Sequence, residues 1–167
     1  RRERARGFLE PFGITLDDLE ASAWFDAYFA DYIAQWRLHD DALPLLDRLA
    51  AIPGVRLGMI TNGDPMFQGR KLAAVGLADR FEVVVASGAE GVVKPDPAIF
   101  HIACERLGVS PSAAVYIGDR LRTDAIGATG AGLTGVWIDR LGVATADELA
   151  EAAAAGVRVI HSLDELP

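Results

Sequence analysis

Five short apolar runs constrain the fold of this 167-residue chain more than any other feature. In the second run Val83, Val84 and Val85 stand in succession, and such unbroken β-branched runs are typical of strands buried on both faces of a parallel sheet. A helix-like stretch separates each run from the next. Strands that alternate with helices at this spacing predict a doubly wound parallel α/β sheet. The runs lie at residues 55–60, 81–86, 113–117, 135–138 and 157–160.

Residues 1–40 contain no such run and look purely helical. Thr15–Asp18 has the form of a capping box that opens a helix, and apolar or aromatic side chains recur at three- and four-residue steps from Leu16 to Trp36. This pattern predicts a helix that packs against other helices rather than one whose rings stack on a ligand. We therefore expect two parts, a helical part over residues 1–40 and an α/β part over residues 41–167.

Composition restricts the partners that such a chain can have. The formal net charge of −8 argues against a surface for nucleic acid or for an anionic membrane. No apolar run approaches the roughly 20 residues that a membrane-spanning helix needs. The single cysteine, Cys104, cannot form an internal disulfide, which suits a reducing cytosol. We expect a cytoplasmic protein that binds small molecules, with neither nucleic acid nor membrane as a partner.

Two carboxylates follow the third apolar run. Gly118-Asp119 ends the run, which reads as a buried strand, and Asp124 comes five residues later. Gly118 is expected to let the backbone turn sharply. The carboxyl ends of strands are where open α/β sheets bind ligands, and two acids without a basic partner favour a hard cation such as Mg²⁺. The alternative is that Asp119 is a turn residue and Asp124 a surface acid.

Two potential anion-binding groups follow other strands. The Thr61 hydroxyl and the backbone amides of Asn62 and Gly63 come directly after the first run, where they can donate to phosphate or carboxylate oxygens. Lys94 lies in a loop before Pro95, which favours an extended backbone. Thr61 can equally belong to an ordinary turn, and Lys94 can be a solvated surface charge.

Taken together, these groups suggest a chemistry. The carboxyl ends of parallel strands converge on one crevice of a doubly wound sheet. Hydroxyl and ammonium donors can hold the oxygens of an anion there, while a cation held by carboxylates neutralises the remaining charge. This set of groups is suited to phosphoryl transfer.

The order of three motifs, Ile60–Gly63, Gly91–Phe100 and Tyr116–Asp124, resembles that of the haloacid dehalogenase-like hydrolase superfamily. The continuation at residues 125–133 fits as well. The resemblance implies a Rossmann-like core over residues 41–167, and residues 1–40 resemble the latter part of the helical cap that such enzymes insert after their first strand.

The resemblance also implies roles for individual residues. Thr61 would bind the transferring phosphoryl group, with help from the amide that follows it. Lys94 would offset the charge of nucleophile and phosphate. Asp119 would bind Mg²⁺ directly, and Asp124 would hold the metal or its waters.

Two departures from the family pattern stand out. The family's nucleophile is an aspartate in an Asp-x-Asp motif that ends a central first strand, whereas Asp17-Asp18 and Asp40-Asp41 follow no apolar strand here. We expect this strand in a segment upstream of the chain, because without it the strands leading to Thr61 and Asp119 would leave a gap in the sheet. Arg120 stands where the family usually has a small polar residue, and could reach an anionic substrate or pair with an acid.

The leading functional hypothesis is a Mg²⁺-dependent phosphatase that acts on a small phosphorylated metabolite through an aspartyl-phosphate. One alternative is a 2-haloacid dehalogenase without a metal. The two acids argue against it, because without a metal they would repel an anionic substrate. A non-catalytic binding protein of the same family and a purely structural fragment are further alternatives. The sequence itself does not choose the substrate.

Overall fold

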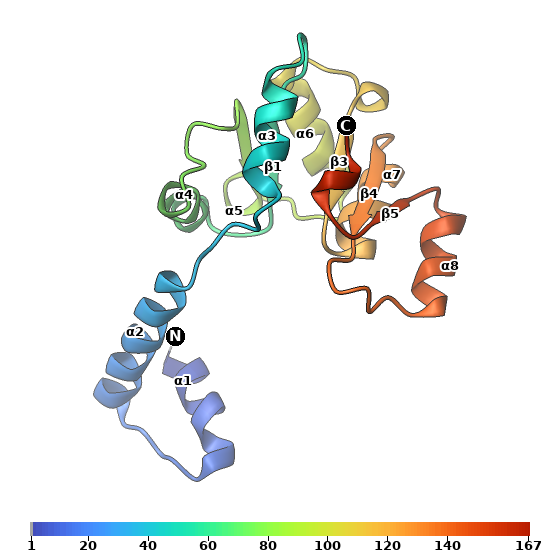
Figure 1. The fold of residues 1–167 in the computed structure, drawn as a ribbon. Helices are drawn as coiled ribbons and strands as arrows, with labels where there is room; N and C mark the ends of the chain where they lie inside the picture. Colours follow the sequence, from blue (N-terminus) through green and yellow to red (C-terminus); the bar gives the residue numbers. More distant parts are fainter. Residues whose placement is uncertain (1) are drawn as a thin grey trace. The chain divides into compact units, whose positions relative to one another are not determined.

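The computed structural model describes residues 2–167; Arg1, the first residue of the predicted cap, lies outside the described residues (Figure 1). The chain divides into two compact units, Arg1–Arg37 and Leu38–Pro167. The helices are α1 (Arg2–Leu9), α2 (Asp18–Ala34), α3 (Ala42–Ala50), α4 (Pro65–Ala74), α5 (Ser87–Glu90), α6 (Pro97–Leu107), α7 (Gly127–Gly130) and α8 (Ala146–Ala154). The strands are β1 (Gly58–Thr61), β2 (Val83–Ala86), β3 (Val115–Gly118), β4 (Thr134–Ile138) and β5 (Arg158–Ile160). No helix within residues 2–167 has the length and apolarity that crossing a membrane requires.

The first unit is a pair of helices, α1 and α2. A capping box opens α2, but it is formed by Asp17 and Glu20 rather than by the predicted Thr15–Asp18 stretch. Asp17 Oδ1 accepts hydrogen bonds of 2.8 Å from the backbone N–H groups of Leu19 and Glu20, and Glu20 accepts one of 2.9 Å from the Asp17 N–H. The predicted N-cap, Thr15, lies two residues before the observed one, Asp17. Both residue types are good N-caps, and only the path of the chain decides between them.

Aromatic side chains of α2 pack against α1 and against each other. Ala5 of α1 is fully buried with Ala21 and Phe25 of α2, while the rings of Trp24 and Tyr28 stack with centroids 5.5 Å apart. This packing agrees with the prediction that the aromatic face contacts another helix.

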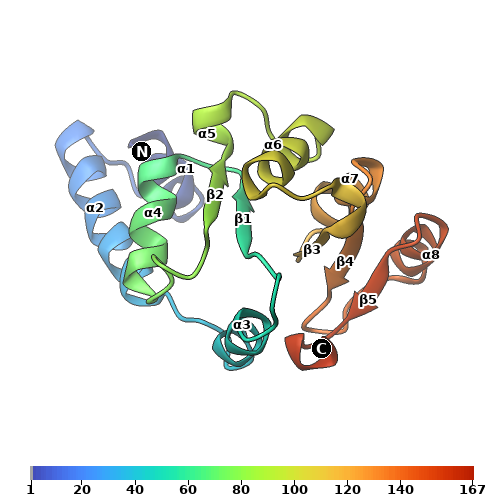
Figure 2. The ribbon, with the colours of Figure 1, turned by 90° about the horizontal axis from the view of Figure 1, so that it is seen from above.

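The second unit contains only parallel strands, which confirms the predicted α/β fold class. β1 pairs with β2 in the register Gly58↔Val83, and β3, β4 and β5 pair in that order (Figure 2). Within the described part of the chain, the two sheets share no strand-to-strand ladder. β1 and β3 therefore each have a partner strand on one side only.

The expectation that the strands are buried on both faces is wrong at two positions. Val84 is 38% exposed and Val115 is 60% exposed. The reason is that β2 and β3 are edge strands of small sheets, so that neighbouring elements cover them only in part. Burial is complete where α6 packs on β2, at Val85 and Phe100.

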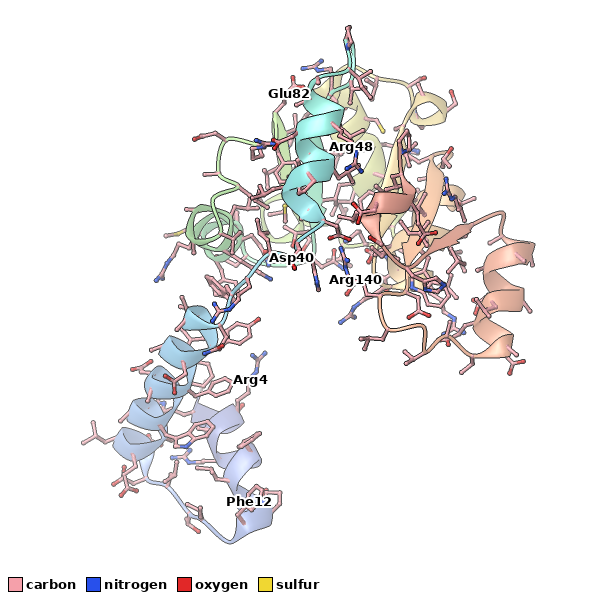
Figure 3. The ribbon with its side chains drawn as sticks, in the orientation of Figure 1. Arg4, Phe12, Asp40, Arg48, Glu82 and Arg140 are labelled. Atoms are coloured by element: carbon pink, nitrogen blue, oxygen red, sulfur yellow. The ribbon has the colours of Figure 1, made fainter. Side chains whose placement is uncertain are left out.

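Asp41, just before α3, is the centre of a network that joins three distant parts of the second unit. Arg140 donates two hydrogen bonds to its carboxylate, of 2.8 and 3.0 Å. Ser162 Oγ and the Leu163 N–H donate two more, of 3.0 and 2.8 Å. In Figure 3 the labelled Arg140 lies near the start of α3, beside Asp40. The bonds from Arg140 are the main cause that lowers the pKa of Asp41, against the opposing effect of burial.

Asp41→Asn is expected to lower the free energy of unfolding by about 2–3 kcal/mol at pH 7, because it leaves the Arg140 charge without its acid. The loss should shrink as the pH falls. A carboxyl with a lowered pKa in the folded state contributes its stability above the unfolded value of about 3.9, and loses it as the pH drops through the folded value. Urea unfolding of both proteins between pH 3 and 7 measures the difference.

The exposed Asp47, which pairs with Arg80, provides the control. Asp47→Asn should cost less than about 1 kcal/mol, because its side chain is 67% exposed. A stability difference between wild type and Asp41→Asn that does not change with pH would contradict the assignment of Asp41.

Candidate active site

The turn after β1 is fixed to the end of β2. The Gly63 N–H donates to Ser87 Oγ at 2.9 Å, and the Gly88 N–H donates to the Gly63 carbonyl at 3.0 Å. Ser87 is buried. The turn holds Thr61, whose side chain is almost buried and whose hydroxyl makes no hydrogen bond with residues 2–167. A free hydroxyl is thus available at the carboxyl end of β1.

The loop that carries Lys94 is attached to the same turn. Asn62 Nδ2 donates to the Lys94 carbonyl at 3.0 Å, and the Lys94 N–H donates to Asn62 Oδ1 at 2.9 Å. The structure therefore brings Thr61, Asn62, Gly63 and Lys94 together, as the sequence predicted. The carboxamide of Asn62, however, contacts the Lys94 backbone, and the Gly63 N–H contacts Ser87.

The ammonium group of Lys94 lies between the two sheets. Its Nζ donates to the Ile60 carbonyl at 3.3 Å, to the Tyr116 hydroxyl at 2.7 Å and to Asp124 Oδ1 at 2.7 Å. The side chains of Lys94 and Asp124 are only 10% and 5% exposed. This burial excludes the alternatives in which Lys94 is a solvated charge and Asp124 a surface acid. The pair links the end of β1 to the segment after β3.

Asp124 lies in a π-helical segment, Leu121–Ile126, that continues into α7. Its second oxygen, Oδ2, accepts a 3.1 Å hydrogen bond from the Arg120 N–H. The side chain packs against Gly118, where a Cβ atom would lie 2.4 Å from Asp124 Cβ. The expectation that Gly118 is needed for a sharp turn is therefore wrong, because its backbone φ lies outside the left-handed region and the requirement is space for the acid.

Gly118→Ala is expected to displace Asp124 and to break its contact with Lys94. The added methyl group would overlap the acid, so the change should lower the free energy of unfolding by about 2–3 kcal/mol. Thermal unfolding followed by circular dichroism measures this loss. As a control, Gly69→Ala adds the same methyl group where nothing lies within 4 Å and should not destabilise the fold. Equal melting temperatures for the two variants would show that Gly118 is not constrained by Asp124.

Sequence reasoning missed Tyr116 and Ser87. The Tyr116 hydroxyl accepts from Lys94 and donates to the Ile60 carbonyl at 3.2 Å, while its ring meets Phe100 edge-on at 5.1 Å. Burial raises the pKa of Tyr116, and the charges of Asp124 and Asp119 raise it further. Tyr116 precedes Gly118 by two residues, and residues two apart in a strand lie on the same face of the sheet. This spacing could have indicated that Tyr116 faces the site.

Asp119 differs from Asp124 in its surroundings. It is exposed, its carboxylate makes no hydrogen bond or ion pair within residues 2–167, and its carbonyl accepts a 3.2 Å bond from Trp137 Nε1. The Arg120 guanidinium likewise forms no ion pair with the described residues. The prediction that Arg120 pairs with an acid finds no support there.

The carboxylates offer part of a cation site. Asp119 has both oxygens available, and each oxygen of Asp124 keeps a lone pair beside its present hydrogen bond. Hard oxygen donors suit Mg²⁺, which keeps several of its own waters and often takes only one or two protein carboxylates. No group of three or more His, Cys, Asp or Glu side chains within residues 2–167 is arranged to hold a metal ion. The two aspartates fit Mg²⁺ as a partial set of ligands.

Comparison with known proteins places this arrangement in context. Residues 1–132 match the family described as haloacid dehalogenase-like hydrolase. The phosphoserine phosphatase of Thermus thermophilus is 44% identical over 87 residues, which cover 52% of this chain and 35% of that protein. The ribulose-1,5-bisphosphate 5-phosphatase of Halopiger xanaduensis is 35% identical over 147 residues, 88% of this chain and 61% of that protein. The chain thus spans less than two thirds of the length of these relatives.

Solved structures show the same relationship. A phosphatase of the family from Thermococcus onnurineus is 33% identical, with a TM-score of 0.71 over 95% of this chain and 66% of that one. A 2-haloacid dehalogenase from Pseudomonas syringae is also 33% identical, with a TM-score of 0.66 over 100% of this chain and 68% of that one.

Proposed function

This chain belongs to the haloacid dehalogenase-like hydrolase family, and on that premise we propose that it forms part of a phosphatase for a small phosphorylated metabolite. The observation that carries the proposal is the buried contact between Lys94 and Asp124, in which the Lys94 ammonium group also donates to the carbonyl of Ile60, the residue before Thr61. The contact joins a cation to an anion, and the neutral hydroxyl donor of Thr61 lies at the carboxyl end of β1, the strand that Lys94 also contacts. The phosphatases among the relatives support the same reaction class.

Thr61 and Lys94 are proposed to bind the transferring phosphoryl group. The Thr61 hydroxyl donates to one phosphoryl oxygen, with help from the backbone N–H of Asn62, whereas the Gly63 N–H is already bonded to Ser87. An ammonium group has three N–H donors, and Lys94 uses all three on Ile60, Tyr116 and Asp124. Lys94 therefore exchanges one of these partners for the anion when substrate binds. Its ammonium group then stabilises the negative charge on the phosphoryl oxygens in the transition state.

Asp119 and Asp124 are proposed to hold Mg²⁺. When bound, the ion would neutralise charge on the phosphoryl oxygens. The two aspartates would supply charged oxygen ligands, and the Arg120 N–H together with Lys94 would keep Asp124 in a fixed orientation.

The nucleophile is proposed to come from a segment that precedes this sequence. An aspartate oxygen of that segment attacks phosphorus, the ester oxygen leaves with a proton supplied by a second acid, and water then hydrolyses the aspartyl-phosphate to inorganic phosphate. The open edges of β1 and β3 support a strand at that place, and residues 1–40 are proposed to belong to a helical cap. A single buried cysteine supports a reducing, cytoplasmic setting.

Hydrolysis of para-nitrophenyl phosphate by the full-length protein, with and without Mg²⁺, tests the proposal. We expect turnover that requires Mg²⁺ and is lost with EDTA. The similarity to a 2-haloacid dehalogenase supports a second candidate activity. Chloride release from 2-chloropropionate without phosphatase activity would favour that alternative.

A further inference from the structure

Asn62 is bonded to the Lys94 backbone in a way that is specific to a carboxamide. Its oxygen accepts from the Lys94 N–H at 2.9 Å, and its nitrogen donates to the Lys94 carbonyl at 3.0 Å. Only a side chain with an acceptor and a donor side by side can make both bonds, and only one orientation of the amide satisfies them. The Asn62 side chain thus pairs with both backbone groups of Lys94, as the backbone of a neighbouring strand would.

The loop depends on this contact. Lys94 belongs to no helix or strand, and within residues 2–167 the hydrogen bonds of its backbone N–H and carbonyl are those to Asn62. Without the Asn62 side chain, the backbone N–H and carbonyl of Lys94 would form hydrogen bonds with water, and the loop would adopt more conformations. Two lost hydrogen bonds permit this, because each contributes only about 1 kcal/mol.

The ammonium end of Lys94 is attached to the same short stretch of chain. Nζ donates to the carbonyl of Ile60, two residues before Asn62. Lys94 is therefore held at both ends by the segment that contains Thr61, and Ser87 fixes that segment at Gly63.

We propose that Asn62 is a positioning residue that sets Lys94 relative to Thr61, rather than a ligand of the substrate through its side chain. The positioning rests on the geometry alone. Its importance for turnover rests on the proposed phosphatase function, in which Lys94 contacts the phosphoryl group.

The composition of the chain offers a direct test. Lys71 and Lys94 are its only two lysines, and Lys71 is exposed on α4. Under native conditions a brief pulse of an acetylating reagent, followed by mass spectrometry, gives the ratio of modification at Lys94 to that at Lys71. In the unmodified sequence we expect Lys94 to react much more slowly, because its side chain is 10% exposed and fully hydrogen-bonded.

Asn62→Ala should raise the Lys94-to-Lys71 ratio roughly tenfold, the effect of losing one to two hydrogen bonds. Asn62→Asp keeps the shape but turns an acceptor toward the Lys94 carbonyl, so the ratio should rise there too. This second variant preserves the test if Asn62→Ala does not fold. Val93→Ala, an exposed residue of the same loop, is the matched control and should leave the ratio unchanged.

Each protein is labelled below its melting temperature, so that global unfolding does not expose Lys94. An unchanged ratio in folded Asn62 variants would overturn the inference. In the full-length enzyme, the same variants should lower kcat for para-nitrophenyl phosphate while Val93→Ala does not. If the labelling ratio rises but kcat stays the same, Asn62 does position Lys94, and the proposed catalytic role of Lys94 fails instead.

Discussion

Asp119→Asn is expected to abolish Mg²⁺-dependent phosphatase turnover of the full-length protein, lowering kcat by about 1,000-fold or more. Asp119 is exposed at the carboxyl end of β3, and no described side chain competes for its carboxylate. Asn has nearly the same shape but offers no negative charge to a hard cation. The change should therefore remove metal affinity without disturbing the fold.

Two measurements separate these effects. Isothermal titration with Mg²⁺ should show weaker binding by Asp119→Asn, and thermal unfolding should show the melting temperature of the unmodified protein. Asp79→Asn, an exposed acid remote in sequence from the motif, is the control and should retain both activity and metal affinity. Full turnover by Asp119→Asn would end the assignment of Asp119 as a metal ligand.

Replacing Lys94 by Met should lower kcat by about 100- to 1,000-fold and also destabilise the protein. The loss of activity follows from the missing ammonium group. The loss of stability follows from Asp124, whose side chain is 5% exposed and would lose its partner. Removing one member of a buried ion pair typically costs about 3–5 kcal/mol.

The double variant Lys94→Met with Asp124→Asn distinguishes the two losses. It removes the unpaired charge, so it should recover much of the free energy of unfolding but none of the activity. Urea unfolding and initial rates on para-nitrophenyl phosphate give the two quantities for a double-mutant cycle. Lys71→Met is the control with the other lysine. Unchanged kcat in folded Lys94→Met would make Lys94 a structural residue only.

Much of the second unit was predictable because its signals are local. Strands can be recognised from runs of apolar, often β-branched residues, and helices from apolar residues at three- and four-residue steps. The parallel α/β class and the family were predicted and are confirmed. The roles of Thr61, Asn62, Gly63, Lys94, Asp119 and Asp124, and the division near residue 40, stay predictions.

Where prediction failed, the cause was the path of the folded chain, which the pattern of residue types does not show. The exposure of Val84 and Val115 depends on which strands flank β2 and β3. The need for glycine at position 118 depends on where the Asp124 side chain lies, and not on the local turn. The start of α2 depends on which of two good caps the chain path favours.

The sequence by itself determined which chemical groups lie at the strand ends, because the spacing of apolar residues along the chain indicates where each strand and helix begins and ends. It could not determine what those groups contact. That Lys94 reaches Asp124 and Tyr116, and that Asn62 holds the Lys94 backbone, was decided by tertiary structure. Hydrogen-bond partners 22 to 32 residues apart are chosen only when sheets and helices pack, since burial then leaves each polar group few alternatives.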